Sequence, residues 1–137
     1  MPIGYSNKIL SDKLGITDSQ KILLMNQPEE YDNLIEKNIK GQLCKKGELP
    51  DLIHLFAASK NEFEKQMRFV LKNIKPTTVI WASWYKKSSG IATDLTGDII
   101  RNFALQNGLV DVKVCAVSDN WSGLKLVVPL KLRKKGV

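Results

Sequence analysis

The chain has 137 residues, 43% of them hydrophobic, which is enough for one ordinary core, so we expect a single domain over residues 1–130. The formal net charge is +7, but residues 131–137 form a basic tail with four of these charges, which leaves +3 on the rest. No apolar run approaches the roughly 20 residues of a membrane span, and the first residues lack a secretory signal, so we expect a cytoplasmic protein without a membrane partner.

The first third of the chain predicts two helices and one or two strands. Residues 6–15 (SNKILSDKLG) combine a serine that can cap a helix, apolar residues at helical spacing and a terminating glycine. Residues 21–25 (KILLM) form a short apolar run that is typical of a buried strand. A second helix is expected over residues 28–41, because proline is tolerated at the first helical position and glycine ends the pattern. Residues 43–44 favour a weak strand.

The middle of the chain carries stronger patterns. Residues 51–57 (DLIHLFA) predict a buried strand, and residues 77–84 (TTVIWASW) are β-branched and aromatic, as in a central strand. Between them, apolar residues recur at helical spacing over 63–74 until Pro76 forbids continuation. A strand, a helix and a second strand are therefore expected in this order.

The last part predicts one helix and two strands. The helix is expected to open at Thr93 or Asp94 and to end at residues 107–108 (NG). Two strands follow at residues 109–117 (LVDVKVCAV) and 124–128 (LKLVV). Their short connection requires an antiparallel pair, whereas the earlier alternation of strands and helices requires parallel crossovers.

These elements predict a small three-layer α/β/α Rossmann-like sandwich. Its sheet should be mostly parallel, with helices on both faces and an antiparallel C-terminal strand. Ligands of such sheets bind beyond the carboxyl ends of the parallel strands. The loops placed there by the prediction are residues 26–30, 58–61 and 85–94.

Two blocks of sequence resemble a known family. Residues 84–96 (WYKKSSGIATDLT) and 108–125 (GLVDVKVCAVSDNWSGLK) are similar to the signature blocks of an uncharacterised bacterial family of small Rossmann-like proteins, a domain of unknown function. The similarity runs from about Leu14 to Val128, and Tyr85 stands where that family prefers a proline. The order of elements also looks like the later half of a class I S-adenosylmethionine-dependent methyltransferase domain. The resemblance implies this fold and brings no established activity.

The first loop argues against the usual cofactors of this fold. A cofactor loop needs glycines after the first strand, but residues 25–31 read MNQPEEY and contain none. Pro28 removes a backbone donor, and Glu29 and Glu30 repel an anionic ligand. Dinucleotide binding and ordinary S-adenosylmethionine binding are therefore not expected, and no cofactor is assigned. The acidic strand end that would hold a ribose is not evident, and Glu48 is left as a candidate substitute.

The loop after the third strong strand is the better candidate for a ligand site. It offers two lysines, two hydroxyls, a glycine that permits positive φ and the unpaired N–H groups of the next helix. It lacks the spacing of a P-loop, Asp94 can cap the same N–H groups, and a solvated connection would have a similar composition. The candidate ligand-binding residues of this block are Trp84, Lys86, Lys87, Ser88, Ser89, Gly90, Thr93 and Asp94.

The second block adds three ligand-binding candidates, Asp119, Trp121 and Ser122. Trp121 can stack on a ligand, dock a partner or cover one end of the core. On the third strand, Trp81 and Trp84 are three residues apart and face opposite sides of the sheet. We expect Trp81 in the core and Trp84 beneath the loop.

No residue is assigned to catalysis or to a metal. His54, the only histidine, lies inside an apolar strand with no assignable nucleophile or orienting carboxylate, which indicates a structural role. Cys44 and Cys115 have neither metal-ligand nor redox spacing, so we expect two buried thiols and no disulfide.

Three function classes remain open. The favoured one is a non-catalytic, methyltransferase-like module that binds a small anionic ligand or a protein partner at the C-terminal strand edge. The second is a divergent S-adenosylmethionine-dependent transferase, and whether the protein is an enzyme at all stays undecided. The third is a weak nucleic-acid binder that uses the basic tail together with Lys45, Lys46, Lys86 and Lys87, and it is not favoured because the tail has no aromatic residue for stacking.

Overall fold

The computed structural model describes residues 8–130, which form one mixed sheet with helices on both faces. The predicted cap Ser6 and the basic tail 131–137 lie outside the described residues. Within residues 8–130, no helix has the length and apolar character that crossing a membrane requires. The elements in chain order are α1 (Leu10–Leu14), β1 (Ile22–Met25), α2 (Tyr31–Ile35), η1 (Lys40–Gln42), β2 (Leu52–Phe56), α3 (Lys60–Lys72), β3 (Val79–Tyr85), η2 (Lys87–Ser89), α4 (Gly97–Gln106), β4 (Val110–Ala116) and β5 (Trp121–Val127).

The sheet has the strand order β1-β2-β3-β5-β4. Strands β1, β2 and β3 are parallel, with Leu52 of β2 paired to Ile22 on one side and to Val79 on the other. Strand β5 runs antiparallel to both of its neighbours and separates β3 from β4. The predicted Rossmann-like α/β fold, mostly parallel with an antiparallel last strand, is therefore confirmed.

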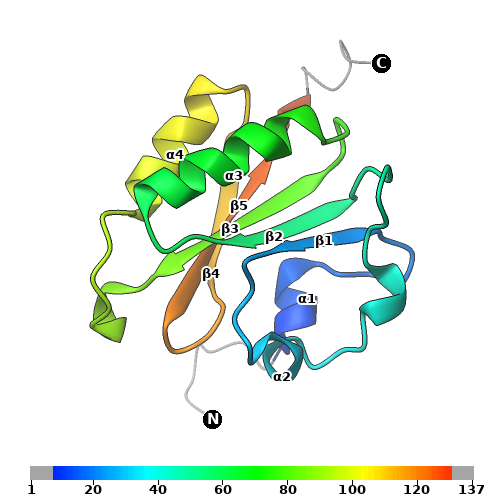
Figure 1. The fold of residues 1–137 in the computed structure, drawn as a ribbon, viewed down its shortest axis with the longest axis horizontal. Helices are drawn as coiled ribbons and strands as arrows, with labels where there is room; N and C mark the ends of the chain where they lie inside the picture. The colour runs from blue at the N-terminus through cyan, green and yellow to red at the C-terminus, as the bar shows by residue number, and fades with distance from the viewer. Residues whose placement is uncertain (1–7, 131–137) are drawn as a thin grey trace.

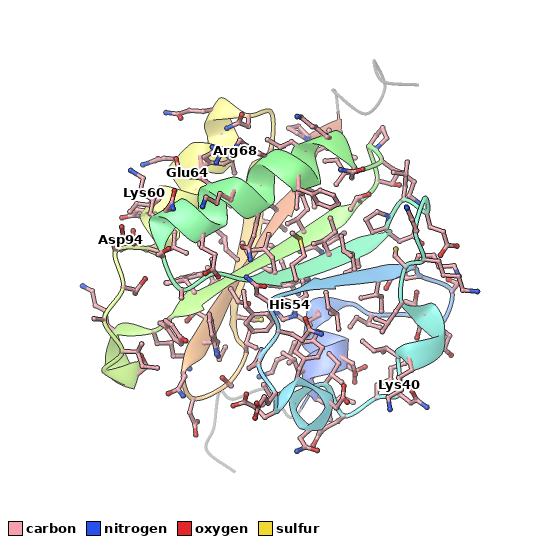
Figure 2. All side chains as sticks on the ribbon, in the orientation of Figure 1. Lys40, His54, Lys60, Glu64, Arg68 and Asp94 are labelled. Atoms are coloured by element: carbon pink, nitrogen blue, oxygen red, sulfur yellow. The ribbon has the colours of Figure 1, made fainter. Side chains whose placement is uncertain are left out.

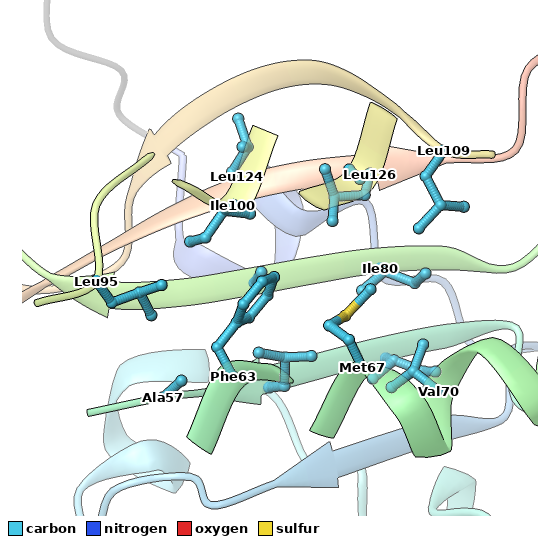
Figure 3. Close-up of a cluster of buried hydrophobic side chains, with 14 residues drawn as sticks. Ala57, Phe63, Met67, Val70, Ile80, Leu95, Ile100, Leu109, Leu124 and Leu126 are labelled. Atoms are coloured by element: carbon cyan, nitrogen blue, oxygen red, sulfur yellow. The ribbon is translucent and has the colours of Figure 1, made fainter. Parts of the chain in front are cut away.

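Helices α3 and α4 cover one face of the sheet, and α1 and α2 cover the other (Figure 1). On the first face, Phe63, Met67 and Val70 of α3 follow helical spacing and pack against the sheet (Figure 3). Ser59 caps α3, because its hydroxyl accepts the N–H of Glu62 at 3.1 Å. This helix is the one that the sequence predicted most clearly.

The second face is covered by two helices of only five residues each. Trp81 is fully buried beneath α1, and its indole N–H donates to the carbonyl of Leu14 at 3.0 Å. Gly15 ends α1 with a φ of 76°, a left-handed conformation that glycine adopts without steric cost. The predicted core position of Trp81 is thus confirmed.

Three helices differ from the prediction. Helix α1 begins at Leu10 with Ile9 as its N-cap, so the predicted cap at Ser6 is wrong. Helix α2 stops at Ile35 and not near Gly41, because Glu36 adopts a φ of 53° that leaves the helical region. Helix α4 begins at Gly97 and not at Thr93 or Asp94, so that prediction is wrong. The predicted weak strand at residues 43–44 is reduced to a single parallel bridge between Leu43 and Ile22.

Candidate functional site

The carboxyl end of β3 brings residues 84–96 next to the β4–β5 turn. The N–H of Lys86, after β3, donates to the carbonyl of Asn120 in the β4–β5 turn at 2.9 Å. Tyr85 and Trp121 are cross-strand partners, and their rings stack with centroids 4.1 Å apart. Residues more than 30 positions apart thus form one continuous surface at the end of the sheet.

A hollow of about 530 Å³ lies where β3 ends and α4 begins, and we call it the β3 pocket. The Trp84 indole forms part of its wall and packs closely beneath the first turn of α4. A Cβ on Gly97 would lie only 3.1 Å from Cζ2 of that ring, so this position requires a glycine or a shifted indole. The pocket is lined by Trp84, Tyr85, Lys86, Lys87, Gly90, Ile91, Ala92, Thr93, Leu95, Thr96 and Gly97.

Five of the predicted residues line the β3 pocket, namely Trp84, Lys86, Lys87, Gly90 and Thr93. Ser89 instead holds the turn: its hydroxyl donates to the carbonyl of Lys86 at 2.7 Å and accepts the N–H of Ile91 at 3.1 Å. Ser88 is exposed beside it. The apolar lining residues Ile91, Ala92 and Leu95 were missed, because nothing in their local sequence separates a pocket wall from an ordinary loop.

Asp94 has a different role from the predicted one. Its carboxylate accepts the N–H of Lys60, the first residue of α3, at 2.8 Å, and Figure 2 shows the two residues side by side. The hydroxyl of Thr93 donates to the carbonyl of Ala58 at 2.8 Å. The N-terminal cap of α4 is Thr96, whose side chain accepts the N–H of Ile99 at 3.2 Å. The loop is therefore tied to the start of α3.

The residues predicted in the second block lie beside the pocket and do not line it. Trp121 is only 8% exposed and packs edge-on against Phe56 with ring centroids 5.0 Å apart. Ser122 is the cross-strand partner of Trp84, and Asp119 is exposed in the turn. The side chain of Trp121 thus closes one end of the core, one of the three roles that its sequence position allowed.

A second place of interest is the carboxyl edge between β1 and β2. After β1 the chain passes to the outer side of β1, where Leu43 forms a parallel bridge with Ile22. It then crosses back to form β2 on the other side of β1, so the order of the strands in the sheet reverses between β1 and β2. Rossmann-like folds bind ligands at such a reversal. Here Glu62 Oε1 accepts the side-chain amide of Asn26 at 3.1 Å and the N–H of Ala58 at 3.3 Å. The Glu62 carboxylate therefore contacts the loop after β1 and the loop after β2, which border the crevice between these two strands.

Asn26 is the residue that the cofactor argument overlooked. Its φ of 57° is left-handed, a conformation that is uncommon for residues other than glycine, so the loop after β1 makes such a turn without a glycine. Glu48, by contrast, is at the wrong end of the sheet: it pairs with Lys21 at 3.6 Å, next to the first residue of β1. Its predicted use as a ribose ligand at the carboxyl edge is wrong.

His54 belongs to a buried polar network. Its Nδ1 lies 2.9 Å from the hydroxyl of Tyr31, and its Nε2 lies 2.7 Å from the hydroxyl of Ser83. Burial lowers the pKa of His54 to about 3 and raises that of Tyr31, so both side chains are neutral at physiological pH. His54 is thus a satisfied core histidine, as its place in an apolar strand predicted.

The two cysteines are free and half-buried, so they are less buried than expected. Burial raises the pKa of both thiols above the ordinary value. Within residues 8–130, no group of three or more histidine, cysteine or acidic side chains is arranged to hold a metal ion.

Among known protein families, curated sequences and solved structures, only solved structures are similar to this chain. No family model and no curated protein sequence matches the chain. Among solved structures, it is similar to the tRNA methyltransferase TrmK of B. subtilis, with a TM-score of 0.58 and 6% identity over 93% of this chain and 68% of that one. A precorrin-6y methyltransferase of Geobacter metallireducens gives a TM-score of 0.53 and 11% identity over 88% and 86% of the two chains.

A third similar structure is the CcbJ methyltransferase of Streptomyces caelestis, with a TM-score of 0.54 and 8% identity over 88% of this chain and 92% of that one. Identities this low establish the fold alone. The chain therefore has a methyltransferase-like Rossmann fold, and the distant similarity to class I S-adenosylmethionine-dependent methyltransferases is confirmed at that level.

Proposed function

We propose that the protein is a non-catalytic, methyltransferase-like module that binds a small anionic ligand in the β3 pocket. The observation that supports this is the composition of the pocket, in which Lys86 and Lys87 accompany the apolar surface of Trp84, Ile91 and Leu95. A pocket with mostly apolar walls and a few charged groups suits a small ligand with an apolar body and an acidic group.

The non-catalytic part of the proposal follows from the chemistry around the pocket. The only histidine is fully buried and belongs to the Tyr31–His54–Ser83 network. Among the described lining residues, none is an acid, a cysteine or a histidine. The lining therefore offers two lysines to bind an acidic group, but no carboxylate, imidazole or thiol to act as a general base.

The test compares two variants that remove equal charge. Phosphate should raise the melting temperature of the native protein at constant ionic strength, because it binds only the folded state. Lys86→Ala with Lys87→Ala should weaken this binding about tenfold, equivalent to about 1.4 kcal/mol for two charge contacts at the surface. Lys45→Ala with Lys46→Ala, in another exposed loop, is the control. Equal phosphate shifts in both double variants would refute the proposed site.

A protein partner that presents an acidic side chain would engage the same two lysines. In that case the partner would dock in the β3 pocket, and millimolar phosphate would not raise the melting temperature of the native protein. The absence of any phosphate effect on the native protein would therefore count against the small-ligand proposal.

The second candidate is an S-adenosylmethionine-dependent transferase, and the left-handed Asn26 at the end of β1 favours it. When bound, that cofactor supplies a methyl group, and the residues that would hold it lie at the crevice between β1 and β2. A ligand that uses the donors of Asn26 and Ala58 has to displace the Glu62 carboxylate, which accepts hydrogen bonds from both.

Calorimetry decides between the two candidates. We expect no binding of S-adenosylmethionine by the native protein in the micromolar range, because the crevice is satisfied internally. A micromolar dissociation constant would contradict this expectation and favour the transferase. A further gain in affinity for Glu62→Ala would then locate the cofactor between β1 and β2.

A further inference from the structure

The α1 side of the β4–β5 hairpin carries an unusual pair of charges. Lys113 of β4 and Lys125 of β5 are direct cross-strand partners. Side chains in such a pair stand on the same face of the sheet with Cβ atoms about 5 Å apart, and like charges there are destabilising. The hairpin therefore keeps an arrangement that works against its own stability.

A third lysine completes the group. Lys13, in α1, lines a hollow of about 290 Å³ together with Lys113, and its other lining residues are Lys8, Val114, Cys115 and Ala116. The ammonium of Lys113 also lies 6.0 Å from the ring centre of Trp81, the residue that α1 covers. We call Lys13, Lys113 and Lys125 the α1–β4 lysine cluster.

No carboxylate compensates this cluster within the part of the chain that the structure describes. The ion pairs among residues 8–130 use Lys21, Lys37, Lys75 and Arg101, and none reaches the cluster. Burial raises the pKa of the Cys115 thiol, and the charges that oppose this effect are those of Lys13, Lys113 and Lys86. The local field at Cys115 is therefore positive.

We propose that the α1–β4 lysine cluster binds the phosphate backbone of a nucleic acid. A nucleic-acid strand carries one negative charge per nucleotide, with a rise of about 3.4 Å in a duplex, so it can place successive charges against lysines on adjacent elements. Such a strand neutralises Lys113 and Lys125 together, which a single carboxylate cannot do. Binding of this kind is independent of sequence and sensitive to salt.

This surface differs from the basic tail as a site for nucleic acid. Strand β5 runs antiparallel to β3, so its last residues lie at the amino edge of the parallel strands, where Val127 pairs with Val110. The chain leaves the described residues at Leu130, after this point. Lys113, in contrast, lies in the middle of the hairpin on the face that α1 partly covers.

The experiment uses charge reversals with a stability readout. Lys113→Glu and Lys125→Glu each create an opposite-charge pair, so each should raise the melting temperature, and the double variant should lose that gain. Each single reversal should also weaken binding of a labelled 20-nucleotide single-stranded RNA about tenfold or more by fluorescence anisotropy, because a cation is replaced by an anion. Lys65→Glu is the control, because Lys65 is exposed in α3 on the opposite face and the substitution changes the net charge equally. It should weaken RNA binding less than threefold.

The outcomes separate this site from net charge, from the tail and from other partners. Equal losses of RNA affinity in Lys113→Glu and Lys65→Glu would overturn the proposal, because the affinity would then depend only on the total charge of the protein. Deletion of residues 131–137 that abolishes binding would also overturn it. So would binding to polyglutamate or to anionic vesicles that depends on Lys113 while RNA does not bind, since the occupant would then be an acidic protein or a membrane.

Discussion

Mild acid should destabilise this protein through one side chain, His54. It is the only histidine in the chain, it is fully buried, and burial lowers its pKa from 6.5 to about 3. Between pH 6.5 and about pH 3, His54 is therefore protonated in the unfolded chain and neutral in the folded protein. The contribution of His54 to stability is complete above pH 6.5 and is lost progressively as the pH falls through this window.

The size of the effect follows from linkage. Each pH unit below 6.5 removes about 1.4 kcal/mol from the free energy of unfolding, so roughly 2 kcal/mol is lost by pH 5. The described carboxyl groups with shifted pKa values are Asp18, Glu48 and Asp51, and each is lowered from an ordinary value of 3.8 or 4.5, so their linkage acts mainly below pH 5. Urea unfolding at pH 5, 6, 7 and 8, followed by tryptophan fluorescence, measures the difference.

His54→Gln is the control. It loses buried hydrogen bonds to Tyr31 and Ser83, so its stability at pH 7 should fall by about 1 to 3 kcal/mol, but it cannot take up a proton. Its unfolding free energy should stay nearly constant between pH 7 and pH 5. Equal stability of the native protein at these two pH values, or an unchanged pH dependence in the variant, would refute this role of His54.

Two further predictions concern the loop around the β3 pocket. Asp94→Ala should lower the unfolding free energy by about 1 kcal/mol, because the N–H of Lys60 at the start of α3 loses its acceptor. Asp119→Ala, in an exposed turn, is the control and should change the unfolding free energy by less than about 0.5 kcal/mol in the same urea assay. Gly97→Ala should cost about 1 kcal/mol or more and alter the fluorescence of Trp84, because the new Cβ meets the indole at 3.1 Å. Gly41→Ala, where nothing lies within 4 Å of the new Cβ, is the matched control, and equal effects at the two glycines would contradict the close approach.

Local patterns predicted most of the elements well. The helical spacing of Phe63, Met67 and Val70 corresponds to α3, and the β-branched and aromatic run before Trp84 corresponds to β3. These predictions succeeded because each element buries one face, and burial imposes a period that residues near in sequence reveal. The helix before Gly41 failed, because a left-handed Glu36 ends α2 after five residues and leaves no signal in composition.

The candidate site was predictable in part. Lys86, Lys87 and Trp84 were chosen from the loop composition and from the resemblance, and the structure places all three at one pocket. The role of Asp94 was not predictable, because its partner Lys60 is 34 residues away and a capping aspartate is ordinarily assigned to the helix that follows it. The engagement of Asn26 and Ala58 by Glu62 likewise joins loops that are far apart in sequence.

The sequence by itself determined the class of fold, since alternating strand and helix patterns require parallel crossovers and the short connection at residues 118–123 requires an antiparallel pair. Only the tertiary structure decided that β5 lies between β3 and β4, because strand order depends on which sheet edge the hairpin joins. That placement sets Lys125 opposite Lys113, and Lys113 lines one hollow with Lys13 of α1. The physical reason is that periodicity reports which face of an element is buried, whereas a functional surface depends on which elements become neighbours.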